Sequence, residues 1–273
     1  MIQGIAYNMN LNNKILLAGP WMGEFGWELF CWQGYVRKLS KNYDETIIIS
    51  RTGHEFLYRD FANKYYNYDT PASKANMWLG EIDQLELKKI LYNVKYSQHL
   101  MPFNIGFSIN GNTTKIVNNA FNQQDFLKYE SDTLDKNVDI LVHARNKIVG
   151  SDRNWNKSNW QALVNLLLKK YTIGVIGTDE AFYLDGTEDL RNLSVEDLVS
   201  VINKTKLVVG QSSGPLHLAS LCGTPHLVWS DNVNRERYEK QWNPFKTPVY
   251  FYSEMGWNPT VDYIYNKIIE NVK

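Results

Sequence analysis

One segment of the sequence has the composition of an anion site at the start of a helix. Gly210-Gln-Ser-Ser-Gly-Pro-Leu-His-Leu-Ala219 lies between a short apolar run and an apolar helical pattern. Pro215 is preorganised for the first turn of a helix. Ser212, Ser213 and Gly214 would place small side chains and backbone N–H groups at the positive end of that helix. The segment therefore predicts a phosphate or pyrophosphate site, with a serine-capped structural helix as the alternative.

Two arginines follow a second apolar run, at Arg145 in His143-Ala-Arg145 and at Arg153 in Arg153-Asn-Trp155. In open α/β sheets, ligands bind beyond the carboxyl ends of the strands. The guanidinium fork of an arginine at that place suits a phosphate, because it offers several donors in one plane. A solvated surface position is the alternative for each arginine.

An acidic turn, Gly177-Thr-Asp-Glu180, follows another apolar run. A carboxylate at this point can accept hydrogen bonds from both hydroxyls of a ribose, as acidic residues do in dinucleotide sites. Asp179 would have the same sequence context if it only capped the following helix. The sequence has neither a phosphate-loop Lys-Ser/Thr after its glycines nor Gly-x-Gly-x-x-Gly, so it predicts no Walker A site.

A carboxylate near the N-terminus is the candidate for proton transfer. Gly23 and Gly26 bracket Glu24, where the first apolar run gives way to a helical pattern. There Glu24 would face an interdomain cleft, and a carboxylate in a cleft can act as a general base on a hydroxyl. For Glu24, and for Glu28 in the next turn, a helix-dipole or capping role is the alternative.

Strands and helices alternate at both ends of the chain, and they must position these side chains. Apolar runs predict strands over 14–18, 46–50, 138–143, 172–176, 206–209 and 226–229. Apolar spacing predicts helices over 27–39, 54–65, 157–170, 195–203, 214–221 and 261–272, and Ser194 with Asp197 forms a capping box for one of them. Between 66 and 135 only 84–94 has a helical pattern.

The alternation predicts an α/β protein with two Rossmann-like domains that face a cleft. The boundary falls in the polar stretch 132–137. We therefore expect an N-terminal domain over 1–135 and a C-terminal domain over 136–258. A final helix within 259–273 is expected to pack across both.

Composition narrows the class of protein. Lys+Arg and Asp+Glu each number 29 in the 273 residues, and this zero net charge argues against a duplex-DNA coat or a polybasic membrane anchor. Cys31 and Cys222 lie far apart in apolar surroundings, which excludes a disulfide framework and a cysteine-based zinc site. The N-terminal segment lacks a signal-peptide pattern and no apolar run is long enough to span a membrane. We therefore expect a soluble cytoplasmic protein.

Taken together, these segments resemble the GT-B glycosyltransferases of the heptosyltransferase-like family. The family's Asp-Ser/Thr-Gly-Pro-x-His-Leu-Ala loop and its Gly-Thr-Pro turn match within 193–229, with Ser212 in place of the family's Asp. Residues 153–160 are similar to its basic-residue–Trp–Pro segment, and 177–180 to its Gly-x-x-x-Glu ribose loop. Gly23-Glu24 falls where the family has Gly-Asp, whose Asp is the proposed base. The resemblance covers about half of the chain.

The resemblance implies an inverting, metal-independent transfer of a sugar from a nucleotide-diphosphate donor to a hydroxyl of a glycan or another acceptor. It implies no metal ion and no cofactor beyond the donor substrate. Glu24 would be the base, and the C-terminal domain would bind the donor. The donor-binding residues would be Arg145, Arg153, Asp179, Glu180, Ser212, Ser213, Gly214 and His217, with His143 and Glu28 as further candidates. His143-Ala-Arg145 is also similar to the His-x-Arg of fucosyltransferases that use GDP-fucose, so the donor nucleotide stays open.

Two alternatives remain at this stage. A nucleotide-sugar or glycan-binding module without turnover is suggested by Ser212 and by the aromatic content of 14%. A modified base in DNA is a second kind of acceptor, and the zero net charge weighs against it, because phosphate contacts need clustered Lys and Arg. Arg235-Glu-Arg237 is too small a cluster to decide the matter.

Overall fold

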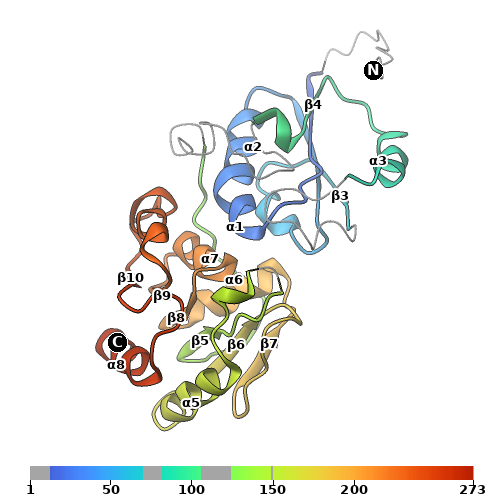
Figure 1. Ribbon diagram of the computed structural model, residues 1–273. Coiled ribbons are helices and arrows are strands. Elements are labelled where there is room, and N and C mark those ends of the chain that lie inside the picture. Colours follow the sequence, from blue (N-terminus) through green and yellow to red (C-terminus); the bar gives the residue numbers. More distant parts are fainter. Residues whose placement is uncertain (1–12, 70–81, 106–123, 149, 273) are drawn as a thin grey trace.

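The computed structural model describes residues 13–69, 82–105, 124–148 and 150–272, and it has one parallel sheet in each half of the chain (Figure 1). The sheet of the first half has the order β3-β2-β1-β4. Its strands are β1 (Ile15–Ala18), β2 (Glu45–Ser50), β3 (Lys64–Asn67) and β4 (Gln98–Leu100). All three strand pairs are parallel. Parallel pairing places the carboxyl ends of these strands at one edge, so the loops after β1 and β2 lie together.

The second sheet has the order β10-β9-β8-β5-β6-β7. Its strands are β5 (Ile140–His143), β6 (Ile173–Gly177), β7 (Glu188–Arg191), β8 (Leu207–Gln211), β9 (His226–Trp229) and β10 (Val249–Tyr252). Numbered along this half, the order is that of the classic dinucleotide-binding fold. The strand order reverses between β5 and β8, where His143 pairs with Gly210. A ligand site is expected at this switch point.

Helices connect the strands. In the first half they are α1 (Phe25–Trp27), the π-helical η1 (Glu28–Trp32), α2 (Gln33–Ser40), η2 (Glu55–Leu57), α3 (Gln84–Leu91) and η4 (Pro102–Ile105). In the second half they are η6 (Ser151–Arg153), α5 (Lys157–Leu167), α6 (Val195–Lys204), α7 (Gly214–Cys222), η7 (Asn232–Asn234), the π-helical η8 (Arg237–Gln241) and α8 (Val261–Asn271). The predicted cap of α6 is confirmed, because Ser194 Oγ accepts a hydrogen bond of 3.1 Å from the N–H of Asp197.

The predicted helix over 54–65 is wrong. The structure has only the short η2 there, followed by turns and then β3, which begins at Lys64. The apolar spacing of this segment fits a helix, but pairing decides the outcome, because β3 adds its backbone hydrogen bonds to the edge of β2. The edge strands β4, β7 and β10 were not predicted, because each is short and two of them are largely polar.

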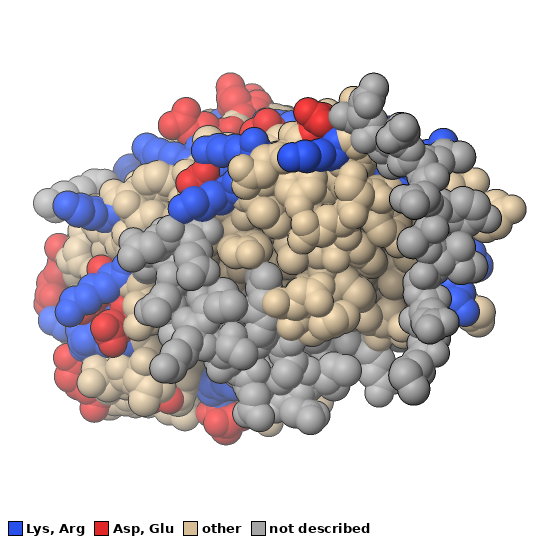
Figure 2. All heavy atoms as spheres, turned by 90° about the horizontal axis from the view of Figure 1, so that it is seen from above, with Lys and Arg blue, Asp and Glu red and all other residues tan. Residues whose placement is uncertain are grey.

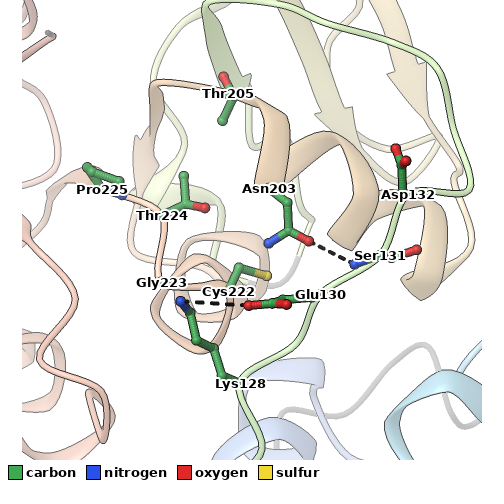
Figure 3. Close-up of a pocket in the computed structure, with 10 residues that line it drawn as sticks. All are labelled: Lys128, Glu130, Ser131, Asp132, Asn203, Thr205, Cys222, Gly223, Thr224 and Pro225. Carbon is green, nitrogen blue, oxygen red and sulfur yellow. Dashed lines mark hydrogen bonds and ion pairs between the residues drawn. The ribbon is translucent and has the colours of Figure 1, made fainter.

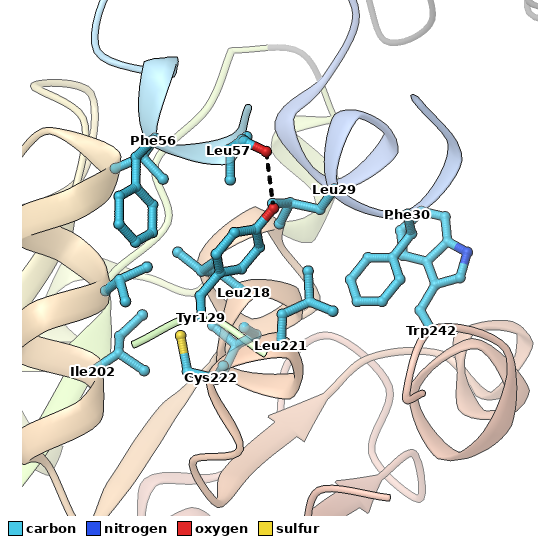
Figure 4. Close-up of a cluster of buried hydrophobic side chains, with 14 of the residues drawn as sticks. Leu29, Phe30, Phe56, Leu57, Tyr129, Ile202, Leu218, Leu221, Cys222 and Trp242 are labelled. Atoms are coloured by element: carbon cyan, nitrogen blue, oxygen red, sulfur yellow. Dashed lines mark hydrogen bonds between the residues drawn. The ribbon is translucent and has the colours of Figure 1, made fainter. Parts of the chain in front are cut away.

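One hydrophobic cluster joins the two halves (Figure 4). It combines Leu29, Phe30, Phe56 and Leu57 of the first half with Ile202, Leu218, Leu221 and Trp242 of the second. The Phe30 and Trp242 rings stack in parallel, with centroids 5.1 Å apart and planes 4° apart. Separating the two halves would expose this apolar surface to water. The hydrophobic effect therefore stabilises their relative orientation.

The C-terminal helix α8 belongs to the second half. Its buried residues, Ile264 and Ile268, join a cluster with Trp155, Trp160 and Trp229 of the second sheet and its covering helices. The main helical partner of α8 is α5. This placement differs from the expected packing of the final helix across both halves, because the apolar stripe of α8 is matched by the aromatic residues beside α5.

Tyr129 joins the two halves from the segment that connects them. Its backbone N–H donates to the carbonyl of Leu221 in the second half, at 2.9 Å. Its hydroxyl lies in the first half, where it is 3.1 Å from the donating Arg37 Nη2 and 3.2 Å from the carbonyl of Leu57 (Figure 4). Burial raises the pKa of Tyr129 to about 12, despite the opposing effect of Arg37, so the hydroxyl stays neutral.

We expect Tyr129→Phe to reduce the free energy of unfolding by about 1–3 kcal/mol, because a buried arginine loses an acceptor. Urea unfolding followed by fluorescence measures this loss. Tyr92→Phe is the matched control, since the Tyr92 side chain is 87% exposed. A loss no larger than that of the control would mean that the Tyr129 hydroxyl does not stabilise the junction.

The surface carries charges of both signs. Figure 2 shows lysine, arginine and acidic side chains around the margin of one face, with other residue types across its middle.

None of the helices in the described ranges has the length and apolar character that a membrane crossing requires.

Candidate functional site

Glu24 lies in the loop that leaves β1. The chain turns at Gly19, whose φ of +121° and close approach to β2 only glycine can accept, because an added Cβ would lie 2.1 Å from the carbonyl oxygen of Ile49. Glu24 itself has extended backbone and immediately precedes α1. The carbonyl of Glu24 accepts a hydrogen bond of 3.1 Å from the N–H of Glu28, which fixes the start of the helix.

The Glu24 carboxylate lies within electrostatic range of cations from the other half. Burial raises the pKa of Glu24, and four cations of the second half oppose that rise. These cations are Lys147, Arg153, Arg145 and Arg237, in order of decreasing effect. The structure therefore brings the predicted base together with both predicted arginines, and it adds Lys147 and Arg237, which the sequence analysis did not assign to the site.

Arg145 holds the loop after β5. Its Nη1 donates to the carbonyl of Gly150 at 2.9 Å and also to the side chain of Asn154. Burial lowers the pKa of Arg145, the nearby Arg153 lowers it further, and Glu24 partly opposes both effects. The guanidinium is thus fixed by its own loop at the switch point of the second sheet.

Arg153 lies beside an aromatic side chain of the loop after β10 and a polar side chain of β8. Its guanidinium is 5.6 Å from the centroid of the Trp257 ring, and Trp257 Nε1 donates to Asp231 Oδ2 at 3.2 Å. The carbonyl of Arg153 accepts a hydrogen bond from the side chain of Gln211, at the end of β8. These contacts orient the loop that follows β5 over the ends of β8 and β9.

Arg237 reaches the site from η8. Its guanidinium lies over two indole rings, 5.3 Å from the centroid of Trp27 and 4.6 Å from that of Trp242. Burial lowers the pKa of Arg237, whereas Tyr238, Cys31 and Glu24 raise it. The sequence shows Arg237 only as part of a small basic cluster. It does not show that Trp27, from the other half, supplies one of the two rings.

Part of the predicted anion site at α7 is occupied by hydrogen bonds within the protein. Ser213 Oγ hydrogen-bonds to His143 Nδ1 at 2.8 Å, and the N–H of Ser213 donates to the Tyr238 hydroxyl at 3.0 Å. Burial lowers the pKa of His143 to about 3, so its ring is neutral and serves as a partner of Ser213. Two N–H groups of the first turn, on Gly214 and Leu216, have no protein acceptor within the described residues and suit an anion.

His217 lies in the cluster between the halves. Its ring stacks on Tyr238, with centroids 4.1 Å apart, and meets Trp242 edge-on at 4.6 Å. Burial, reinforced by Arg237, lowers the pKa of His217 well below its ordinary value. The sequence placed His217 among the donor-binding residues, but the structure encloses its ring among aromatic side chains, because the ring faces the first half.

The predicted ribose loop is exposed after β6. Asp179 and Glu180 are both exposed, and Glu180 is close enough to Arg145 to raise the pKa of that arginine. Gly177 has a φ of +133°, and an added Cβ would lie 3.0 Å from His143 Cδ2. Glycine therefore lets the loop after β6 approach His143 at the end of β5.

Glu28 is separate from Glu24 and completely buried. Burial acts to raise the pKa of Glu28, but the charge and hydrogen bond of His54, together with Arg51 and Tyr58, lower it overall. The hydroxyls of Ser50 and Tyr58 each donate to Glu28 Oε1 at 2.7 Å. Glu28 is therefore an ionised carboxylate inside the first half, and Arg145, Arg153 and Arg237 are not among the groups that shift its pKa.

A hollow of about 690 Å³ lies away from these residues (Figure 3). It is lined by the connecting segment and by the ends of α6 and α7, including Lys128, Asn203 and Cys222. Its polar groups largely bond within the protein, as when Asn203 Oδ1 accepts from the N–H of Ser131 at 3.0 Å. Burial raises the pKa of the Cys222 thiol, so it is not a thiolate nucleophile.

The sequence matches no protein-family model and no curated protein, but the structure resembles solved structures over nearly its whole length. Escherichia coli ADP-heptose lipopolysaccharide heptosyltransferase II aligns with a TM-score of 0.63 and 11% identity, covering 95% of this chain and 98% of that one. E. coli heptosyltransferase WaaC with ADP-2-deoxy-2-fluoro heptose gives 0.57 and 11%, covering 94% and 99%. The family 9 glycosyltransferase from Veillonella parvula gives 0.54 and 10%, covering 96% and 90%.

The chain has the heptosyltransferase-like GT-B glycosyltransferase fold. The expected fold class, two Rossmann-like α/β units, is thereby confirmed. In this GT-B chain the loop after β1 meets the start of α7, where an added Cβ on Gly214 would lie 2.8 Å from Phe25 Cδ1. The loop after β2 meets the start of α6, where the N–H of Val195 donates to the carbonyl of Gly53 at 3.1 Å. The candidate site therefore lies where the two halves join.

Proposed function

We propose that this protein is a glycosyltransferase that moves a sugar from a nucleotide-diphosphate donor to a hydroxyl of an acceptor, with inversion and without a metal ion. The GT-B fold supports the reaction class, and solved structures that share the fold include WaaC with ADP. The observation that carries the proposal is the carboxylate of Glu24 in one half facing four cations of the other half. A cytoplasmic location and a glycan acceptor belong to the same proposal.

The second half would bind the donor. The N–H groups at the start of α7 and the guanidinium groups of Arg145 and Arg153 would donate hydrogen bonds to the diphosphate, whose negative charge grows as the bond to the sugar breaks. Lys147 and Arg237 add positive charge at the same place. Asp179 or Glu180 would hold the ribose, since both are exposed beyond the end of β6.

The first half would supply the base. Glu24 would take the proton of the acceptor hydroxyl as its oxygen forms a bond to the anomeric carbon, and the nucleoside diphosphate would leave on the opposite side. Burial holds the pKa of Glu24 above its ordinary value, which makes the carboxylate a stronger base than an exposed one. A bound diphosphate would offset the nearby cations and strengthen that basicity further.

Donor binding is tested first. We expect one of ADP, GDP, UDP and dTDP to raise the melting temperature selectively, because a ligand that binds only the folded state stabilises it. The matching nucleotide sugar should then be consumed when an acceptor is present. Binding without transfer or hydrolysis across a wide acceptor panel would favour the non-catalytic binding module, which Ser212 in place of an acidic residue also supports. No stabilisation by any of the four would contradict the proposal.

We expect Arg153→Gln to weaken nucleoside diphosphate binding about tenfold or more, because a charged hydrogen bond to phosphate contributes about 1.5–3 kcal/mol. Isothermal titration calorimetry measures this loss. Lys206→Gln is the matched control, since Lys206 pairs with Asp139 at the opposite end of the second sheet. Equal affinity in the Arg153 variant and in the control would remove Arg153 from the donor site.

A further inference from the structure

The first half contains a carboxylate–imidazole pair that the proposed reaction does not use. His54 follows β2 and lies 2.7 Å, through Nδ1, from Oε2 of Glu28. The Glu28 side chain has no exposed surface, whereas that of His54 is 16% exposed. Glu28 begins a π-helical turn, and such turns occur frequently at functional sites. Burying an ionised carboxylate costs free energy. A functional role of the partly exposed His54 ring that Glu28 contacts would account for this cost.

The outer nitrogen of His54 is available to a ligand. Within the described residues, Nε2 makes no hydrogen bond, and it is not among the buried atoms that lack a partner. Water therefore reaches Nε2. Because Glu28 is bonded to Nδ1, it holds the ring in one orientation with Nε2 pointing away from the interior.

His54 lies close to the start of α7. The Phe25 ring meets the His54 ring edge-on, with centroids 5.3 Å apart. Phe25 also contacts Gly214, where an added Cβ would lie 2.8 Å from Phe25 Cδ1. One phenyl ring thus separates the imidazole from the first residue of α7, where the N–H groups suit an anion.

The charges around His54 favour an anionic ligand. From its own half it faces Glu28, with Arg51 beside that carboxylate, and Tyr58 bonded to it. From the second half, Glu196 at the start of α6 is already paired with Arg59. Glu28 and Glu196 are therefore both paired, which reduces the repulsion that these two carboxylates would exert on a phosphate.

We propose that His54, oriented by Glu28, is a binding residue for the diphosphate of the donor and is contributed by the first half. This inference rests on the proposed function. One phosphoryl group would accept from the first turn of α7, and the other would accept from His54 Nε2–H. With diphosphate bound, the ring would lie between two anions, and the imidazolium form is the one that donates to both. Glu28 is then a positioning residue, because it acts through His54.

Binding measurements test this role. The probes are inorganic pyrophosphate and the nucleoside diphosphate and monophosphate of whichever base the wild-type protein binds. We expect His54→Ala to weaken pyrophosphate and diphosphate binding about tenfold, the effect of losing a charged hydrogen bond, and to change monophosphate affinity less than about twofold. His54→Gln, which keeps a donor, should recover part of the loss. Glu28→Gln should also weaken diphosphate binding relative to monophosphate binding. It should have no further effect when combined with His54→Ala.

Other results would overturn the inference. An equal loss of monophosphate and diphosphate affinity in His54→Ala would show that the pair only supports the fold. Unchanged diphosphate affinity with lost transfer would place His54 on the acceptor instead. If the wild-type protein bound neither pyrophosphate nor any nucleoside diphosphate, the proposed function would fail as well. Diphosphate binding that ignores His54 would leave that function standing and remove only the inference. Removing His54 leaves the buried Glu28 carboxylate without that partner, so His54→Gln, which keeps a donor beside Glu28, is the variant that tests the inference if His54→Ala does not fold.

Discussion

Glu24→Gln is expected to reduce sugar transfer about a hundredfold to ten-thousandfold, which is the usual contribution of a general base. The amide keeps the shape of the side chain but cannot accept the proton of the acceptor hydroxyl. Nucleoside diphosphate binding should be unchanged or tighter, because the variant removes a negative charge that faces four cations. Initial rates at saturating donor, with calorimetric titration of the diphosphate, separate the two effects.

Glu130→Gln is the matched control, because the Glu130 side chain is 77% exposed on the connecting segment, and its activity should equal that of the wild type. The pH dependence adds a second check. Only the carboxylate form of Glu24 is a base, and burial raises the pKa of Glu24, so activity should fall as the pH is lowered through that raised value. This acid limb should be absent from the residual activity of the variant. Transfer within about threefold of the wild-type rate would remove Glu24 from the role of base.

Phe30→Ala is expected to have the largest effect on stability. The side chain is fully buried, stacks on Trp242 and touches Phe126 and His217, so its removal should cost about 3–5 kcal/mol of the free energy of unfolding. Since Phe30 and Trp242 belong to different halves, the loss should also weaken their coupling. We expect the urea transition of the variant to be broader than that of the wild type, or to separate into two.

A double-mutant cycle tests this coupling. Phe30→Ala and Trp242→Ala should be non-additive by about 0.5–3 kcal/mol, because the two rings are in contact. Phe103→Ala is the control, since that side chain is 51% exposed and its loss should change stability by less than about 0.5 kcal/mol. Additive losses in the cycle would mean that this ring pair does not hold the halves together.

Both predictions depend on contacts across the two halves, and the sequence did not show which residues of the two halves meet. It identified Glu24, Arg145 and Arg153 as chemical groups, because each follows an apolar run at a turn. It did not show Arg237, whose role depends on Trp27 and Glu24 from the other half. Local sequence carries no record of such long-range contacts.

Histidines show the same limit. His217 was assigned to donor binding by motif and His143 was a further candidate, but burial makes His143 a neutral partner of Ser213 and encloses His217 among aromatic rings. His54, which lay within the wrongly predicted helix, is instead the partly exposed partner of Glu28. Whether an imidazole is a ligand or a core residue depends on what packs against it, and its neighbours in sequence do not determine that.

The sequence by itself determined the alternation of strands and helices, the capped start of α6, the glycine-rich turns and the class of fold. It could do so because periodicity, capping and turn geometry act over a few residues. Tertiary structure decided that 64–67 is a strand, that α8 packs on α5, and that Glu24 faces four cations. Those outcomes depend on backbone pairing, apolar burial and charge proximity between segments far apart in the chain, which exist only once the two sheets are folded against each other.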